Sequence, residues 1–205
     1  MKKLGVLISG GGTNLQAIID NIENGNIRGR IELVVSNNKG AYGLIRAQRA
    51  GIDSLFINPK DFSSNQEYNL KLIQEFKARK VDLIVLAGYL KILSPDFIKE
   101  FRNRIINIHP SLIPSFSGDG YYGERVHRAV IQYGCKVSGA TVHLVDEGTD
   151  TGPIILQECV KVDDEETVES LQRKVLEVEH KILVDAVRLF CEDRLSVEGR
   201  QVKIL

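Results

Sequence analysis

Leu4-Gly5-Val6-Leu7-Ile8-Ser9, followed by Gly10-Gly11-Gly12-Thr13-Asn14, decides the fold that we expect for this chain. The first six residues form a short apolar run typical of a strand that is buried on both faces. The glycines predict a tight turn. Residues 15–19 then carry apolar side chains at helical spacing, and Asn24-Gly25 is a plausible end of that helix. A strand, a glycine turn and a helix in this order aim backbone N–H groups at an anion.

The kind of anion follows from what the turn lacks. The dinucleotide fingerprint needs a third glycine where Leu15 stands, and the Walker loop needs a Gly-Lys-Ser/Thr that is absent. A single phosphate therefore fits best, with Thr13 and Asn14 as side-chain donors. The alternative is a structural turn in which Thr13 or Asn14 only caps the helix.

The rest of the chain alternates between strand and helix patterns, which predicts a mainly parallel, twisted α/β sheet covered on both faces. The expected strands are residues 31–36, 54–57, 81–87 and 105–109, and the expected helices are residues 42–50, 65–80, one that starts at Ser94-Pro95, and 124–133. Later elements are strands 136–145 and 154–162, which could pair antiparallel, a long amphipathic helix 165–192, and a small C-terminal hairpin. We expect one Rossmann-like domain over residues 1–205, with antiparallel strands added in its C-terminal half.

Bulk composition excludes several classes of protein. Lys+Arg and Asp+Glu are balanced at 27 each, so no overall field favours nucleic acid or a membrane surface as a partner. No apolar run approaches the roughly 20 residues of a membrane span. The three cysteines are far apart and form no CxxC motif, which favours a reducing compartment over a disulfide or zinc site. We therefore expect a cytoplasmic protein.

Asn107-Ile108-His109-Pro110-Ser111 carries the clearest chemical signal in the chain. The pattern predicts the end of a buried strand, with Asn107 and His109 on one face because side chains alternate along a strand. Pro110 ends the strand. Since ligands of open α/β sheets bind at the carboxyl ends of strands, this Asn–His pair is the first candidate for chemistry.

A loop rich in carboxylates, residues 146–153, supplies the next candidate. Its Gly, Asp and Thr residues fit a turn that bonds its own backbone, but one Asp could instead face His109 and raise its pKa. The imidazolium and Asn107 would then be two donors for an oxyanion. Without a Ser or Cys nucleophile, these groups suggest direct acyl-type transfer. A Ser-His-Asp hydrolase with Ser111 as the nucleophile is an alternative, but Ser111 lacks the glycine-flanked nucleophile elbow of such enzymes. The four histidines show no metal-ligand spacing, so we expect no metal.

Four segments carry a resemblance to a known family: SGGGTNLQ (9–16), LAGYLKIL (86–93), NIHPSLIPSF (107–116) and GATVHLVDEGTDTGP (139–153). Together they resemble the phosphoribosylglycinamide formyltransferases, folate-dependent enzymes of purine synthesis, essentially from end to end. The resemblance implies the formyltransferase fold and a small-molecule reaction. In that reaction the amine of phosphoribosylglycinamide attacks the formyl carbon of the co-substrate 10-formyltetrahydrofolate and gives a tetrahedral intermediate.

The resemblance also implies roles for particular residues. Asn107, His109 and Asp150 match the catalytic trio, in which Asp150 holds up the pKa of His109 and helps to move the proton. The positions that match the phosphate and ribose site are Gly12, Thr13, Asn14 and Glu179. The positions that match the folate site are Asn65, Leu90, Lys91, Ile92, Leu93, Asn107, Val145, Asp146 and Asp150. The phosphate half would then be about residues 1–100, and the catalytic and folate-binding half about residues 101–205.

Two departures from the family pattern stand out. Many relatives have a basic residue where this chain has Asn65, so the contact with the folate tail changes there. The segment 117–123 is longer than in many relatives and has Ser117 where a proline is common.

The alternatives lie in three other classes of protein. A formyltetrahydrofolate hydrolase would use the same trio to pass the formyl group to water, but it carries an N-terminal regulatory domain. A methionyl-tRNA formyltransferase needs a C-terminal tRNA-binding domain, whereas this chain has no net basic charge. A non-catalytic nucleotide-binding module would explain the glycine turn but not the trio. We expect a monomer or a homodimer.

Overall fold

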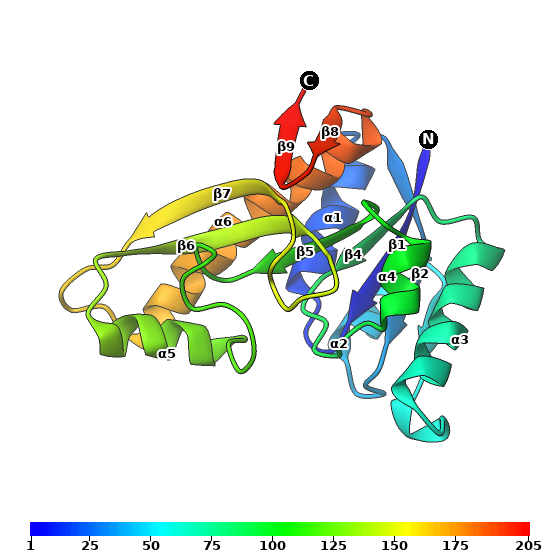
Figure 1. The fold of residues 1–205 in the computed structure, drawn as a ribbon, viewed down its shortest axis with the longest axis horizontal. Coiled ribbons are helices and arrows are strands. Elements are labelled where there is room, and N and C mark those ends of the chain that lie inside the picture. The colour runs from blue at the N-terminus through cyan, green and yellow to red at the C-terminus, as the bar shows by residue number, and fades with distance from the viewer.

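The computed structural model describes residues 1–205, and its nine strands form one sheet in the order β3-β2-β1-β4-β5-β6-β7-β9-β8 (Figure 1). The parallel part consists of β1 (Lys2–Ile8), β2 (Gly29–Ser36), β3 (Ser54–Phe56), β4 (Leu83–Leu86) and β5 (Ile105–His109). The strands β6 (Val137–Leu144) and β7 (Ile154–Lys161) then join antiparallel, and β8 (Leu195–Glu198) and β9 (Gln201–Ile204) form a hairpin. The predicted mixed α/β sheet is confirmed.

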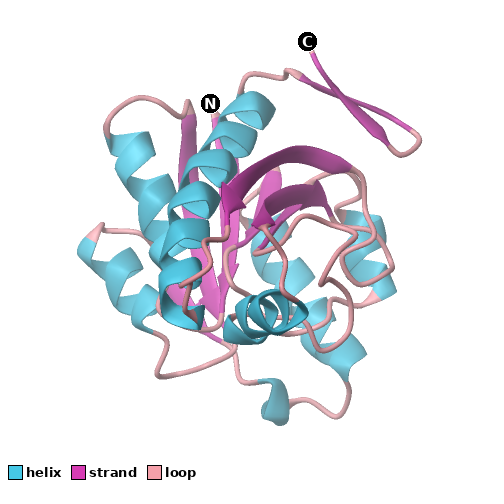
Figure 2. Cartoon of the chain, turned by 90° about the vertical axis from the view of Figure 1, so that its left-hand side faces the viewer, coloured by secondary structure: helices cyan, strands magenta, loops and turns pink.

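Helices cover both faces of the sheet (Figures 1 and 2). One face carries α1 (Thr13–Glu23), α2 (Tyr42–Arg49) and α6 (Val168–Cys191), and the other carries α3 (Asn65–Ala78) and α4 (Pro95–Glu100). The helix α5 (Glu124–Tyr133) packs against α6, and a short 3₁₀ turn spans Pro59–Asp61. The predicted start of α6 at Glu165 is three residues early, because Thr167 caps the helix by accepting the N–H of Ser170 at 3.1 Å.

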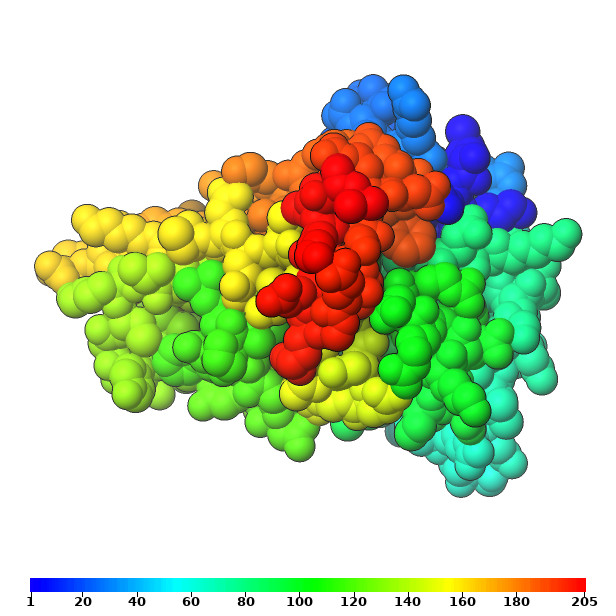
Figure 3. All heavy atoms as spheres, turned by 45° about the horizontal axis from the view of Figure 1, so that its top comes forward, coloured from blue at the N-terminus to red at the C-terminus, as the bar shows by residue number.

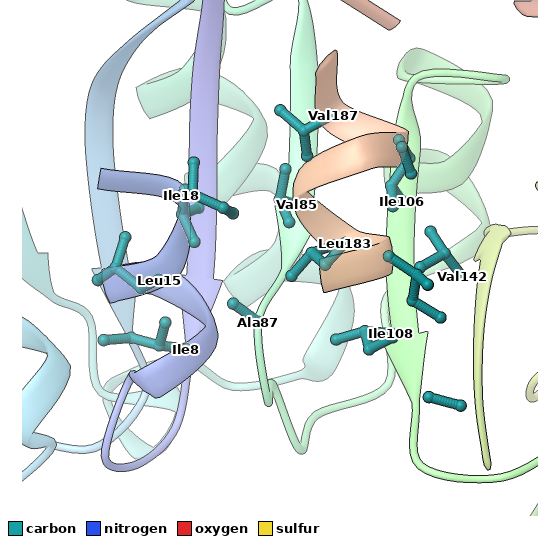
Figure 4. Packing of buried hydrophobic residues seen from close by; sticks show 14 of the residues in the cluster. Ile8, Leu15, Ile18, Val85, Ala87, Ile106, Ile108, Val142, Leu183 and Val187 are labelled. Atoms are coloured by element: carbon teal, nitrogen blue, oxygen red, sulfur yellow. The ribbon is translucent and has the colours of Figure 1, made fainter. Parts of the chain in front are cut away.

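Alternation along the central strands divides the core into two clusters. In β1, Val6 and Ile8 face α1 and α6, whereas Leu7 faces α3 and α4. Figure 4 shows that Leu183 and Val187 of α6 pack on the strands β4, β5 and β6. Burial on both faces is what the continuous apolar runs of the sequence predicted.

The change from parallel to antiparallel pairing occurs between β5 and β6. In this register Asn107 lies opposite His143, and His109 lies opposite Thr141. Ile106 and Ile108 pack on the face of β5 that is covered by the apolar residues of α6. Asn107 and His109 lie on the opposite face of the strand. The sheet thus presents two polar side chains at the carboxyl end of β5.

The C-terminal hairpin β8–β9 lies on the outside of the molecule, above β7 and α6 (Figure 3). It extends the sheet through a single residue pair, Ile154 with Gln201. Among the helices, none combines the length and apolar character needed to span a bilayer.

Candidate active site

A cavity of about 590 Å³ opens at the carboxyl ends of β4 and β5, within the size range of small-molecule sites. Its lining includes most of the residues predicted from the sequence: Asn14, Leu90, Lys91, Ile92, Leu93, Asn107, His109, Val145, Asp146, Asp150 and Glu179. Gly12 and Thr13 adjoin the cavity at the start of α1. Asn65 is outside the lining, but its Nδ2 donates to the Ile92 carbonyl at 3.3 Å. The cavity draws on both halves of the chain.

Of the three predicted catalytic side chains, Asp150 contacts both of the others. Asp150 Oδ2 is 3.4 Å from Nδ1 of His109, and Asp150 Oδ1 accepts the Asn107 amide at 3.4 Å. His109 is buried, and Asp150 is largely covered. Asp150 has a φ of +56°, a left-handed conformation that Asp and Asn tolerate better than other side chains.

Two opposing effects set the pKa of the His109 imidazole. Burial lowers the pKa of His109 below its usual value, and the opposing effect of the Asp150 carboxylate does not fully offset it. The predicted effect of Asp150, which raises this pKa, is therefore present, but the sequence did not reveal how deeply the ring is buried. Nε2 donates to the Phe116 carbonyl at 2.9 Å, so protonation adds the second hydrogen on Nδ1, toward Asp150.

The carboxylate itself stays ionised at neutral pH. Burial alone would raise the pKa of Asp150, but the His143 and His109 rings and the Gly118 N–H together hold it below its usual value. Gly118 donates to Asp150 Oδ2 at 3.0 Å. Asp150 thus supplies a fixed negative charge beside His109.

His143 is the site residue that sequence reasoning missed. Its Nδ1 donates to the Leu144 carbonyl at 2.8 Å, which leaves Nε2 free to accept the Asn107 amide at 3.1 Å. Nε2 is also 3.6 Å from Asp150 Oδ1. The signal was the alternation of Thr141 and His143 on the strand that pairs with β5, but only the register places His143 opposite Asn107.

The cavity reaches Asn14, which directly follows the glycine turn at the start of α1. Gly12 occupies the N-cap of α1 with a φ of +71° and no side chain caps the helix, so the alternative of a Thr13 or Asn14 cap is excluded. Asn14 Nδ2 instead donates to Glu179 Oε2 at 2.8 Å, and Asn14 Oδ1 is buried without a partner. Burial raises the pKa of Glu179 to about 7, against the effect of the Asn14 bond. These acceptors suit a ligand with hydroxyl donors.

Comparison with known proteins identifies the fold and family. Residues 2–187 match the family model described as formyl transferase. The chain is 42% identical to the phosphoribosylglycinamide formyltransferase of Haemophilus influenzae over 97% of this chain and 91% of that protein. The crystal structure of glycinamide ribonucleotide transformylase 1 from Symbiobacterium toebii superimposes with a TM-score of 0.95 at 48% identity, over 100% of this chain and 94% of that one. The chain belongs to the formyl transferase family.

Within the formyl transferases, the resemblance to the phosphoribosylglycinamide enzymes is thereby confirmed. The trifunctional purine biosynthetic protein adenosine-3 of Drosophila melanogaster is 45% identical over 87% of this chain, which spans only 13% of that protein's length. The same formyl transferase domain therefore also occurs inside a much longer protein.

The third wall of the formyl transferase cavity is an apolar rim between β4 and α4. Leu90 and Ile92 are 61% and 72% exposed and line the cavity, so they offer apolar surface to a ligand. The rim is tied to the glycine turn because Ser9 Oγ accepts the Leu90 N–H at 2.9 Å. No cluster of three or more His, Cys, Asp or Glu residues is arranged to hold a metal ion.

Proposed function

We propose that the chain transfers the formyl group of 10-formyltetrahydrofolate to the amine of phosphoribosylglycinamide, in the de novo synthesis of the purine nucleotide IMP. One observation carries the proposal: Asn107, His109 and Asp150 meet in a cavity that reaches Asn14, beside the glycine turn, at one end and an apolar rim at the other. The turn suits a phosphate, and the rim suits a flat, largely apolar ring.

The reaction is a direct transfer. The amine nitrogen bonds to the formyl carbon, the bond from that carbon to N10 of the folate breaks, and the proton lost by the amine ends on N10. Asn107 and the protonated His109 donate to the oxyanion of the tetrahedral intermediate. For this contact Asn107 gives up its 3.4 Å bond to Asp150, and His109 gives up its bond to the Phe116 carbonyl. Asp150 balances the imidazolium charge and helps to move the proton through water.

Each substrate has its own set of residues in this proposal. Gly12, Thr13 and Asn14 hold the phosphate, and Glu179 accepts hydroxyl groups of the ribose. The folate lies against Leu90, Lys91, Ile92, Leu93, Val145 and Asp146, with Asn65 near its tail. The reaction as proposed uses no metal.

The proposal extends to the setting in which the protein works. We place it in the cytoplasm as a monomer or homodimer whose partners are these two small molecules, without nucleic acid or a membrane. The single domain would divide into a phosphate half at about residues 1–100 and a catalytic and folate-binding half at about residues 101–205. Light scattering of the purified protein measures the oligomeric state, and fractionation of cells measures the location.

The deciding experiment incubates the protein with 10-formyltetrahydrofolate in the presence and absence of phosphoribosylglycinamide. Formyl transfer predicts that tetrahydrofolate appears only with the amine and in equal amount to the formylated product. Equal release of tetrahydrofolate in both samples would identify a hydrolase, and release in neither would reject an enzymatic role.

A further inference from the structure

The peptide groups of the glycine turn are held from outside the cavity by α2. Gly43, near the start of that helix, donates its N–H to the Gly10 carbonyl at 3.1 Å. One turn later, Arg46 donates Nε to the Gly11 carbonyl at 2.8 Å and Nη1 to Gln16 Oε1 at 3.1 Å. Two consecutive carbonyls of the turn are therefore directed at α2.

The planarity of the peptide bond makes this arrangement significant for the anion site. In a trans peptide the N–H points away from the carbonyl of the same unit. Because the Gly10 and Gly11 carbonyls face α2, the N–H groups of Gly11 and Gly12 point away from it. Neither N–H donates to another group of the protein, so both remain available to a ligand.

The contact between α2 and the turn is close enough to fix the conformation of the turn. A Cβ on Gly12 would lie 2.7 Å from the Gly43 Cα, and a Cβ on Gly43 would lie 3.3 Å from the Gly12 Cα. Arg46 is half-buried, with its guanidinium 5.0 Å from the ring centre of Tyr42, and it does not line the cavity. Arg46 can therefore act on the site only through its bonds to the turn.

We propose that Arg46 is a positioning residue for the phosphate of the amine substrate, acting through the Gly11 carbonyl. The charge-assisted bond fixes the orientation of the Gly11–Gly12 peptide and polarises it, which strengthens the Gly12 N–H as a donor to the phosphate. Arg46 has no part in the chemistry at the formyl carbon. This inference rests on the proposed function only in taking the ligand to be a phosphate monoester.

The test compares Arg46→Ala and Arg46→Lys with the control Arg49→Ala. Arg49 is exposed on the same helix and donates to the Tyr42 hydroxyl at 3.0 Å, but it does not touch the turn. We expect Arg46→Ala to raise KM for phosphoribosylglycinamide about tenfold or more, as expected for loss of a hydrogen bond to a charged group. Its kcat and its KM for the formyl folate should stay within about twofold. Arg46→Lys keeps the charge but cannot make both hydrogen bonds of the guanidinium, so its KM for phosphoribosylglycinamide should be intermediate. The same KM in Arg49→Ala should match that of the wild type.

A second measurement is independent of turnover: binding of ribose 5-phosphate, followed by calorimetry, with thermal unfolding recorded for each variant. Weaker binding by Arg46→Ala with partial recovery in Arg46→Lys supports the inference even if wild-type protein proves inactive toward the amine. An unchanged KM and unchanged ribose 5-phosphate affinity in Arg46→Ala would overturn it. An equal loss in Arg49→Ala, or a loss that affects kcat and both KM values alike, would also overturn it and identify α2 as scaffold only.

Discussion

The two ends of the cavity are built in different ways. At the proposed phosphate end, the turn between β1 and α1 has backbone N–H groups without a protein partner, and α2 holds the turn through Gly43 and Arg46. At the catalytic end, side chains from β5, β6 and the 146–153 loop meet, and single contacts such as Gly118 to Asp150 and Phe116 to His109 tie them to the 110–123 loop. In the proposed function, the phosphate end binds its ligand through backbone groups, whereas the catalytic end acts through charged side chains.

This difference predicts that substitutions at the two ends change different kinetic constants. A change in backbone shape at the turn should weaken substrate binding and spare the chemical step. A change in charge at the trio should lower kcat and spare phosphate binding.

The largest effect is expected from Asp150→Asn. Asn keeps the side-chain size and tolerates the φ of +56°, so the substitution removes the charge alone. We expect kcat to fall by at least about a hundredfold, a typical effect of removing a catalytic group, with KM for phosphoribosylglycinamide within about threefold. The pKa of His109 should also fall further, because the carboxylate that raises it is gone, and NMR titration of the ring measures this. A variant that retains near-normal kcat would contradict the role of Asp150.

The matching test at the phosphate end is Gly12→Ala. The added methyl group meets the Gly43 backbone and imposes a side chain on a left-handed residue, which costs about 1–2 kcal/mol before any repacking. The turn should shift, and KM for phosphoribosylglycinamide should rise about tenfold or more while KM for the formyl folate is unchanged. Steady-state kinetics with each substrate varied in turn checks this. An equal rise in both KM values would mean that the two ends are not separate.

Glu179 titrates at the phosphate end. Its titration shows whether charge at that end affects the stability of the free protein. Its pKa of about 7 in the folded protein exceeds the usual 4.5, so the folded state keeps a proton that the unfolded state loses between these values. The contribution of this group to the free energy of unfolding is complete below pH 4.5 and is lost as the pH rises through 7. The loss amounts to at most about 3 kcal/mol. Glu179→Gln should remove this dependence, as urea unfolding at pH 5 and pH 8 would measure. Parallel pH profiles of the variant and the wild type would contradict it.

The smallest effect is expected from Asn65→Ala at the edge of the apolar rim. The Asn65 side chain donates to the Ile92 carbonyl at 3.3 Å, accepts from Asn69 Nδ2 at 3.1 Å, and lies outside the cavity lining. Neutral bonds of this kind contribute little, so KM for the formyl folate should change by no more than about threefold. Ile92→Ala, which removes exposed apolar surface from the rim, serves as the positive control and should weaken folate binding more. A large effect at Asn65 would show that it contacts the folate tail directly.

Local sequence patterns predicted most of the fold and part of the site. Alternation placed Asn107 and His109 on one face of β5, and the glycine run predicted the turn between β1 and α1, because both features depend on neighbouring residues alone. His143 was missed because the antiparallel register that sets it opposite Asn107 is a long-range property. The lowered pKa of His109 and the support from Arg46 depend on burial and on packing between helices, which no short stretch of sequence encodes.

The claim that a formyl group passes directly between two bound substrates can be tested by turnover in water labelled with ¹⁸O. Mass spectrometry then measures the label in the formylated phosphoribosylglycinamide and in any formate. Direct attack by the amine predicts an unlabelled formyl group in the product and no formate above the enzyme-free control. Labelled formate formed at the rate of folate release would contradict direct transfer and assign the trio to hydrolysis.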